Sequence, residues 1–351
     1  MKAAYARHDL RFLRPAITSR SVMTVKETYF LKLWNEDNPG IYGLGECAVF
    51  RGLGSDDRPD YEARLAQLCR DINDSRDTGD IAQWSSIMFG YETAMLDLSN
   101  GGKRVIAPTP WSQGAAEIAI NGLVWMGSAD EMLGRIDEKI SAGFRCIKLK
   151  IGGIEFDDEI RLLGYIRSHF PIGQLELRLD ANGAFAPADA LSKLSRLARF
   201  GIHSIEQPIR QGQWGEMSRL CMTSPIPIAL DEELIGISDA DTKARMLDAI
   251  HPAYIILKPS LCGGFRSASE WIDMAEERGI GWWVTSALES NIGLNAIAQW
   301  TSSMSTSIPQ GLGTGMLYAN NIASPLRQIR DAIIYDTSAQ WQIPELTWNE
   351  G

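Results

Sequence analysis

The sequence predicts an α/β barrel preceded by a smaller α+β region, and three observations lead to this fold class. From about residue 116 onward, short apolar strands alternate with amphipathic helical stretches every 25–30 residues or so, which is typical of a parallel sheet. No glycine-rich phosphate turn follows the first of these strands, which disfavours the rival fold, an open doubly wound sheet. The first 115 residues instead combine a hairpin pattern with two helical patterns.

In the N-terminal region, residues 25–34 alternate and are rich in β-branched and aromatic side chains, so we expect a strand there. Asn38-Pro39-Gly40 predicts a turn, and residues 41–48 predict the second strand of a hairpin. Residues 61–72 and 83–98 are expected to be helices. Together these elements predict a small α+β domain over residues 1–115.

The barrel is expected over residues 116–316. Its strands are predicted at residues 117–121, 144–151, 175–180, 204–207, 226–231, 254–258, 281–286 and 310–314. Its helices are predicted at residues 129–142, 156–169, 187–200, 213–221, 238–249, 265–278 and 292–302. Eight strands with seven helices over about 200 residues fit a (β/α) barrel. Residues 317–351 contain no further unit of this kind, so we expect them to pack back onto the N-terminal domain.

Composition narrows the classes of partner. The chain has 351 residues, with 34 basic and 44 acidic side chains and a net charge of −10, so neither nucleic acid nor an anionic membrane is an expected partner. No apolar run approaches the roughly 18 residues that span a membrane. Five scattered cysteines without a C-x-x-C pair indicate reduced thiols, and the N-terminus does not resemble a signal peptide, so we expect a cytoplasmic protein.

Charged residues at the strand ends indicate where the chemistry lies. In residues 147–151, three aliphatic side chains share one face of the strand, so Lys148 and Lys150 share the other and point into the barrel. The next four strands end in Asp180, Glu206, Asp231 and Lys258. The carboxyl ends of parallel barrel strands meet at one mouth, so these side chains are expected to converge.

Three converging carboxylates would repel one another unless a cation lay among them. All-oxygen ligands favour a hard divalent ion, with Mg²⁺ the first choice, flanked by Lys150 and Lys258. A single aspartate at a strand end is more often a helix cap, but five charged ends in succession argue for a site. A metal-bound carboxylate stabilises the enediolate left when a proton leaves the adjacent carbon. Lys150, its pKa lowered by Lys148 and the metal, is a candidate base.

The motifs resemble those of the enolase superfamily, over nearly the whole chain. They are Lys148-Leu149-Lys150, Asp180-Ala181-Asn182, Ile205-Glu206-Gln207-Pro208, Leu230-Asp231-Glu232 and Leu257-Lys258-Pro259-Ser260. Residues 43–48 are similar to part of that superfamily's capping domain. The resemblance implies a modified (β/α)7β TIM-type barrel with an N-terminal capping domain that the C-terminal segment completes. The K-x-K motif with a lysine on the sixth strand places the resemblance in the muconate-lactonizing-like subgroup.

Within this subgroup, the turns at residues 285–291 and 311–315 resemble those of the o-succinylbenzoate synthase family. That resemblance implies Mg²⁺-dependent syn-dehydration of 2-succinyl-6-hydroxy-2,4-cyclohexadiene-1-carboxylate, a step of menaquinone biosynthesis. N-acylamino-acid racemases and dipeptide epimerases use the same two lysines and stay open as alternatives. Dipeptide epimerases usually carry D-x-D after the eighth strand, whereas residues 316–321 contain no acid here. A non-catalytic metal-binding scaffold would be expected to have lost a lysine or a ligand, and none is lost.

The resemblance also implies roles for single residues. Asp180, Glu206 and Asp231 would bind Mg²⁺, with Mn²⁺ as a substitute, and strand parity chooses Asp231 over its acidic neighbours. Lys150 would remove the α proton and then protonate the departing hydroxide, Lys258 would face the ring as a cation, and Lys148 would hold the carboxylate. Substrate-binding residues would be Asn182, Ser286, Ser290, Gly313 and Thr314. Ser19, Arg20, Phe50 and Arg51 lie in loops expected to close over a small carboxylate substrate. The sequence leaves a homo-oligomer open.

Overall fold

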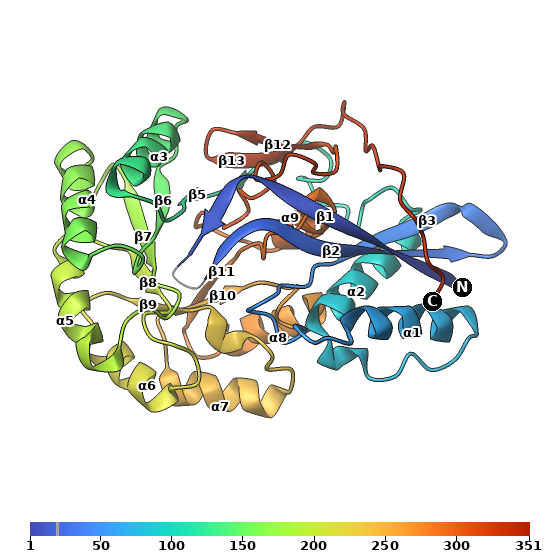
Figure 1. The fold of residues 1–351 in the computed structure, drawn as a ribbon, viewed down its shortest axis with the longest axis horizontal. Helices are drawn as coiled ribbons and strands as arrows, with labels where there is room; N and C mark the ends of the chain where they lie inside the picture. Colours follow the sequence, from blue (N-terminus) through green and yellow to red (C-terminus); the bar gives the residue numbers. More distant parts are fainter. Residues whose placement is uncertain (19–20) are drawn as a thin grey trace.

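The computed structural model of the protein describes residues 1–18 and 21–351. Its centre is a seven-stranded parallel sheet that curls round on itself and carries helices on its outer side (Figure 1). The strands follow one another in chain order: β5 (Gly122–Val124), β6 (Cys146–Lys150), β7 (Glu176–Asp180), β8 (Ser204–Glu206), β9 (Ile228–Leu230), β10 (Tyr254–Leu257) and β11 (Gly281–Val284). The predicted α/β barrel class is therefore confirmed.

The two edges of this sheet are joined by a short stretch of chain. Gln310 forms a parallel bridge with Ile120, and Gly311 forms one with Thr285. The N–H of Gly311 donates to the carbonyl of Val284 at 2.8 Å, and the carbonyl of Gln310 accepts from Asn121 at 2.9 Å. The strand expected at residues 310–314 is thus reduced to these bridges, yet it still closes the ring of strands.

The first barrel strand was misplaced by the sequence pattern. Residues 117–121 were expected to form it, whereas the strand of the parallel sheet is β5, Gly122–Val124. Ile118–Ala119 form β4, which pairs antiparallel with β13 (Ala332–Tyr335), itself paired with β12 (Leu326–Ile329). The apolar pattern runs on through this region, so it does not mark where the chain passes from one sheet to the other.

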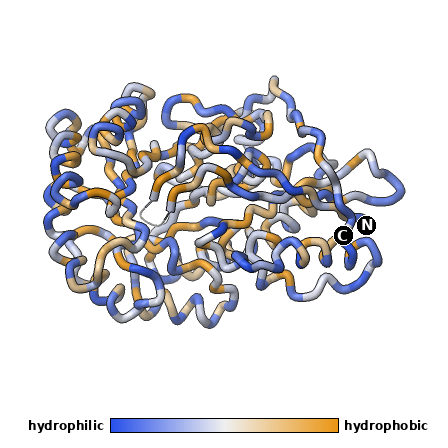
Figure 2. The backbone as a smooth tube through the Cα atoms, in the orientation of Figure 1, coloured by the Kyte–Doolittle hydropathy of each residue, from blue (hydrophilic) through white to orange (hydrophobic). Residues whose placement is uncertain are grey.

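Seven helices among the described residues cover the parallel sheet. They are α3 (Ala129–Ser141), α4 (Phe156–His169), α5 (Pro187–Ala198), α6 (Trp214–Thr223), α7 (Ala240–Ile250), α8 (Gly264–Glu276) and α9 (Asn291–Ser302). Ser128 and Glu131 form a capping box at the start of α3, and Pro187 occupies the first turn of α5, where a missing N–H costs nothing. The aliphatic side chains of β6 and β7 are buried, and Figure 2 shows hydrophobic stretches on the inner strands and also along the helices.

The N-terminal region is an antiparallel sheet with two helices. Its strands are β1 (Lys2–Ile17), β2 (Val22–Asn35) and β3 (Asn38–Cys47), and its helices are α1 (Tyr61–Asn73) and α2 (Ser85–Ser99), with the 3₁₀ turn η1 (Ile81–Gln83) between them. The predicted hairpin and both helices are present. The turn lies at residues 36–37 rather than 38–40, because β3 already begins at Asn38. Strand β1 was not predicted.

The C-terminal segment runs back along the N-terminal sheet. Asn349 forms an antiparallel bridge with Tyr5, and Tyr318 forms one with Phe12. Figure 1 shows the two ends of the chain side by side. Domain boundaries at residues 115 and 316 stay a prediction. Among the described residues, no helix is both long and apolar enough to cross a membrane.

Candidate active site

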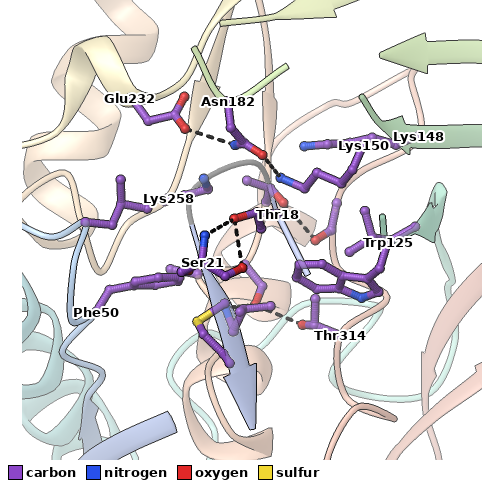
Figure 3. Close-up of a pocket in the computed structure, with 18 of the residues that line it drawn as sticks. Thr18, Ser21, Phe50, Trp125, Lys148, Lys150, Asn182, Glu232, Lys258 and Thr314 are labelled. Carbon is purple, nitrogen blue, oxygen red and sulfur yellow. Dashed lines mark hydrogen bonds between the residues drawn. The ribbon is translucent and has the colours of Figure 1, made fainter. Parts of the chain in front are cut away.

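A cavity of about 90 Å³ lies where the carboxyl ends of the parallel strands face the N-terminal sheet. Both parts of the chain line it: Met23 and Phe50 from the N-terminal region, and Lys148, Lys150 and Lys258 from the barrel. Figure 3 shows Lys258 entering the cavity from the side opposite Lys148 and Lys150. The sequence-predicted lysines are therefore brought together around one space.

The lysines pair with the three carboxylates predicted as metal ligands. Lys148 Nζ lies 2.9 Å from Asp180 Oδ2 and 2.5 Å from Glu206 Oε2. Lys150 Nζ lies 2.6 Å from the same oxygen of Asp180. Across the cavity, Lys258 forms an ion pair with Asp231. The three carboxylates and the two lysines of β6 are nearly inaccessible to solvent, so these are buried charge pairs.

The strand register places these groups. In the parallel ladder Lys150 is opposite Asp180, and Asp180 is opposite Glu206. Neighbouring strands lie roughly 4.8 Å apart, so side chains at paired positions on the same face contact one another. Asp231 follows β9 directly, and the 3₁₀ turn η2 (Glu232–Leu234) begins after it. The ends of four successive strands thus present their polar side chains at one level of the barrel.

Burial and charge shift the pKa values of this cluster in opposite directions. Burial alone would raise the pKa of Asp180, but the Lys148 and Lys150 ammonium groups outweigh it and hold that pKa below its usual range. Burial would lower the pKa of Lys148, but the surrounding carboxylates outweigh it and raise that pKa. The pKa of Glu206 is raised, first by burial and then by the nearby charges of Asp180 and Asp231.

The carboxylate oxygens of this cluster are the type of ligand that a hard divalent cation prefers. Oε1 of Glu206 is buried and has no hydrogen-bond partner among the residues that the structure describes, although buried acceptors are normally satisfied. Asp180 and Asp231 present further carboxylate oxygens beside it. In the described part of the chain, no three acidic, thiol or imidazole side chains are grouped as in a formed metal site. The ammonium groups of the lysines contact these carboxylate oxygens instead.

Four of the five predicted substrate-binding residues line the cavity, namely Asn182, Ser286, Gly313 and Thr314. Asn182 accepts a hydrogen bond from Lys150 Nζ at 2.9 Å and donates one to Glu232 at 2.9 Å, as Figure 3 shows. Its backbone has a φ of 45°, a left-handed conformation that asparagine tolerates better than most residues. On the wall formed by the seventh and eighth strand positions, Thr314 donates to Ser286 at 2.8 Å. Gly313 lies beside them in the lining.

The remaining predicted residues divide into two groups. Ser290 does not line the cavity: its hydroxyl donates to Glu46 Oε2 at 2.5 Å and caps helix α9. Phe50 and Arg51 do line the cavity, and Arg51 also pairs with Glu27 at 2.7 Å. Ser19 and Arg20 lie outside the described residues.

Sequence reasoning missed residues that shape the cavity. Trp125 forms part of the wall, with its ring centre 5.9 Å from Lys150 Nζ (Figure 3). Asn121 and Leu123 line the same wall. These three residues follow one another two positions apart, so their side chains lie on the same face of an extended chain. Placing the strand at residues 122–124 would have predicted that this face points into the barrel. Glu232, an acidic neighbour that strand parity did not choose as a metal ligand, also lines the cavity.

Comparisons with known proteins find relatives over nearly the whole chain. Residues 131–334 match the family model described as "Enolase C-terminal domain-like". The chain is 47% identical to an o-succinylbenzoate synthase of Desulfotalea psychrophila, over 93% of this chain and 96% of that protein. It is 26% identical to a hydrophobic dipeptide epimerase of Citrifermentans bemidjiense, over 79% of this chain and 78% of that protein.

Solved structures also superpose on nearly the whole chain. The crystal structure of MenC from Desulfotalea psychrophila superposes with a TM-score of 0.84 at 44% identity, covering 95% of this chain and 99% of that one. A muconate lactonizing enzyme from Pseudomonas fluorescens superposes with a TM-score of 0.82 at 22% identity, covering 98% of this chain and 96% of that one, and so shares the fold.

Proposed function

We propose that this chain, which belongs to the o-succinylbenzoate synthase family of the enolase superfamily, dehydrates 2-succinyl-6-hydroxy-2,4-cyclohexadiene-1-carboxylate to o-succinylbenzoate. One observation carries the proposal. Two lysines, Lys150 and Lys258, face one cavity from opposite sides, beside three buried carboxylates from successive strands. This is an arrangement for removing a proton next to a carboxylate and compensating the charge that results.

Mg²⁺ is the metal that we propose for the site, with Asp180, Glu206 and Asp231 as its ligands. To bind it, these carboxylates would exchange their contacts with the lysine ammonium groups for contacts with the ion, which frees the lysines for the substrate. When bound, the ion supplies positive charge beside the substrate carboxylate, where negative charge grows as the α proton leaves.

Lys150 is the proposed base. Its Nζ takes the α proton, the C–H electrons form the new ring double bond, and the C–OH bond breaks. The same ammonium group then gives its proton to the departing hydroxide, which leaves as water and returns Lys150 to its neutral form. One group serves both steps only if proton and hydroxide leave from the same face of the ring, as in a syn-dehydration.

Two further lysines assist in this proposal. Lys258 presents its charge to the opposite face of the ring, where a cation near a π system is favourable. Lys148, which lies between Asp180 and Glu206, would hold the substrate carboxylate and keep Lys150 in place. Asn182 orients Lys150 directly through its 2.9 Å hydrogen bond.

Product identity tests the proposal. Protein loaded with Mg²⁺ is incubated with the cyclohexadiene substrate, and the product is identified by NMR. We expect o-succinylbenzoate, and we expect a chelator to stop its formation until Mg²⁺ is restored. An unchanged substrate in the presence of Mg²⁺ would contradict the proposed function.

A second candidate is an N-acylamino-acid racemase. The opposed positions of Lys150 and Lys258 favour it, since such lysines can exchange a proton on the two faces of one carbon (Figure 3). Dipeptide epimerisation is less favoured, because residues 316–321 offer no acid for a substrate amino group. Polarimetry on an N-succinyl amino acid measures the racemase activity directly.

The setting of the reaction is part of the proposal. A role in menaquinone biosynthesis follows from the proposed product. A cytoplasmic location is supported by five cysteines that are all free, which is usual for proteins of reducing compartments. The proposed partner is the small carboxylate substrate, and a homo-oligomer stays open.

A further inference from the structure

A second, larger cavity shares a wall with the first. It measures about 300 Å³ and lies between β1, β5, helix α3 and the segment after residue 313. Leu123, Trp125 and Gly313 line both cavities. These shared residues separate the two cavities, which are therefore neighbours at the same mouth of the barrel.

The size of the first cavity makes this neighbour relevant. An apolar protein cavity of about 150 Å³ binds benzene, whereas the cavity with the lysines measures about 90 Å³. A ring that carries both a carboxylate and a four-carbon succinyl arm is larger than benzene. If the ring lies at the lysines, its arm must extend beyond this space.

The second cavity carries an excess of positive charge. Arg14, Arg135 and Lys139 line it, against one carboxylate, Glu138. Arg14 lies 3.7 Å from Glu138, but both side chains are largely exposed, so this pair holds its partners weakly. Lys139 Nζ lies 5.0 Å from the ring centre of Phe144. An anion in this cavity would thus meet more cations than carboxylates.

Arg135 is held in a fixed position beside the shared wall. Its Nη1 donates to the carbonyl oxygens of Trp125 at 2.8 Å and Met126 at 2.7 Å. A guanidinium has five N–H donors, so further donors stay available to a ligand. The nearby acid Glu131 is engaged at the start of α3, where it accepts from Ser128 N at 2.8 Å.

We propose that the second cavity binds the distal carboxylate of the substrate's succinyl arm, with Arg135 as the anchoring residue and Lys139 and Arg14 as supporting charges. The arm would run past Leu123 and Trp125, which pack against its methylene groups. This inference rests on the proposed function, since that function defines a ligand with two carboxylates. It assigns the selection of succinyl-bearing ligands to residues on α3 and β1.

Binding of two matched ligands tests the inference. Isothermal titration of the Mg²⁺-loaded protein compares o-succinylbenzoate with 2-butyrylbenzoate, whose arm ends in a methyl group instead of a carboxylate. We expect wild type to prefer o-succinylbenzoate by about ten- to hundredfold, the range for a charged hydrogen-bonded pair. Arg135→Met should remove most of this preference and leave the affinity for 2-butyrylbenzoate unchanged. Arg161→Met, which removes an exposed cation on α4, should change neither affinity.

Lys139→Met provides a second variant, since among the described residues the Lys139 side chain donates no hydrogen bond to the main chain. It should reduce the preference severalfold, and circular dichroism confirms that each variant is folded. A wild-type preference in both folded variants would overturn the inference. If dehydration is observed but the preference is unaffected, the inference fails and the proposed function stands. If dehydration is absent but the preference depends on Arg135, the proposed function fails and the carboxylate site stands.

Discussion

Replacing Glu206 by glutamine tests the proposed metal site by changing one charge and almost no volume. Oε2 of Glu206 accepts from Lys148 at 2.5 Å, and an amide oxygen can still accept that bond. Oε1 has no hydrogen-bond partner among the described residues, and the carboxylates of Asp180 and Asp231 beside Glu206 can accept from an amide N–H. We therefore expect Glu206→Gln to fold, and its main defect to appear when Mg²⁺ is added.

The expected size of the defect follows from binding linkage. At a Mg²⁺ concentration of about 100 times Kd, wild type gains about 2.7 kcal/mol of stability. Loss of a charged ligand should weaken affinity by about 100-fold, the upper end of what supporting residues contribute. At the same concentration the variant then gains only about 0.4 kcal/mol. In thermal unfolding of a 351-residue chain this is a rise of about 4 °C for wild type and about 0.5 °C for the variant.

Glu232→Gln is the matched control, since it removes the same charge from a buried neighbour that is not a proposed ligand. Scanning fluorimetry with Mg²⁺ and with chelator measures all three proteins. We expect Glu232→Gln to keep most of the wild-type gain. A full wild-type gain in Glu206→Gln, or an equal loss in Glu232→Gln, would refute the assignment of the ligands.

Three further predictions concern the base, a buried acid and the packing of the N-terminal sheet. Lys150→Ala should abolish dehydration while the far-UV circular dichroism stays unchanged, and measurable turnover would remove Lys150 as the base. Burial raises the pKa of Glu159 to about 7, so the unfolded chain releases this proton at lower pH than the native protein does. Stability should consequently fall by a few kcal/mol as pH rises from about 4.5 to 7; urea unfolding of Glu159→Gln should show a flatter profile, and an unchanged profile would refute this. Gly45→Ala should cost about 3 kcal/mol or more in urea unfolding, because its Cβ would lie 1.8 Å from the carbonyl oxygen of Gly90. Gly134→Ala on α3, with nothing within 4 Å of the new Cβ, should instead stabilise by up to about 1 kcal/mol, and similar midpoints for the two variants would contradict this packing argument.

The alternation of side chains along the strands was the most informative sequence signal, because a charged side chain on a parallel strand that is buried on both faces needs a partner. Lys148 and Lys150 alternate with aliphatic residues that must face the helices, and this alone predicts that both point into the barrel. The register of β6, β7 and β8 then brings Asp180 and Glu206 to the same level, as expected.

Where the sequence misled, the cause was a contact between distant segments. Residues 118–119 pair with β13, more than 200 positions away, and no local pattern reports that pairing. The misplaced first strand in turn hid Trp125 from the predicted site. Ser290 lies in a turn that resembles one of the o-succinylbenzoate synthase family, but its hydroxyl donates a hydrogen bond to Glu46 of the N-terminal sheet. Contacts between segments that are far apart in the sequence decide both cases.

The ratio of two activities in one preparation tests the central claim most directly. With Mg²⁺-loaded protein, kcat/KM is measured for formation of o-succinylbenzoate from the cyclohexadiene substrate and for racemisation of an N-succinyl amino acid. The proposed function predicts the larger value for dehydration, and its loss on addition of a chelator. Efficient racemisation without any aromatic product would contradict it and identify the two lysines as a racemase pair.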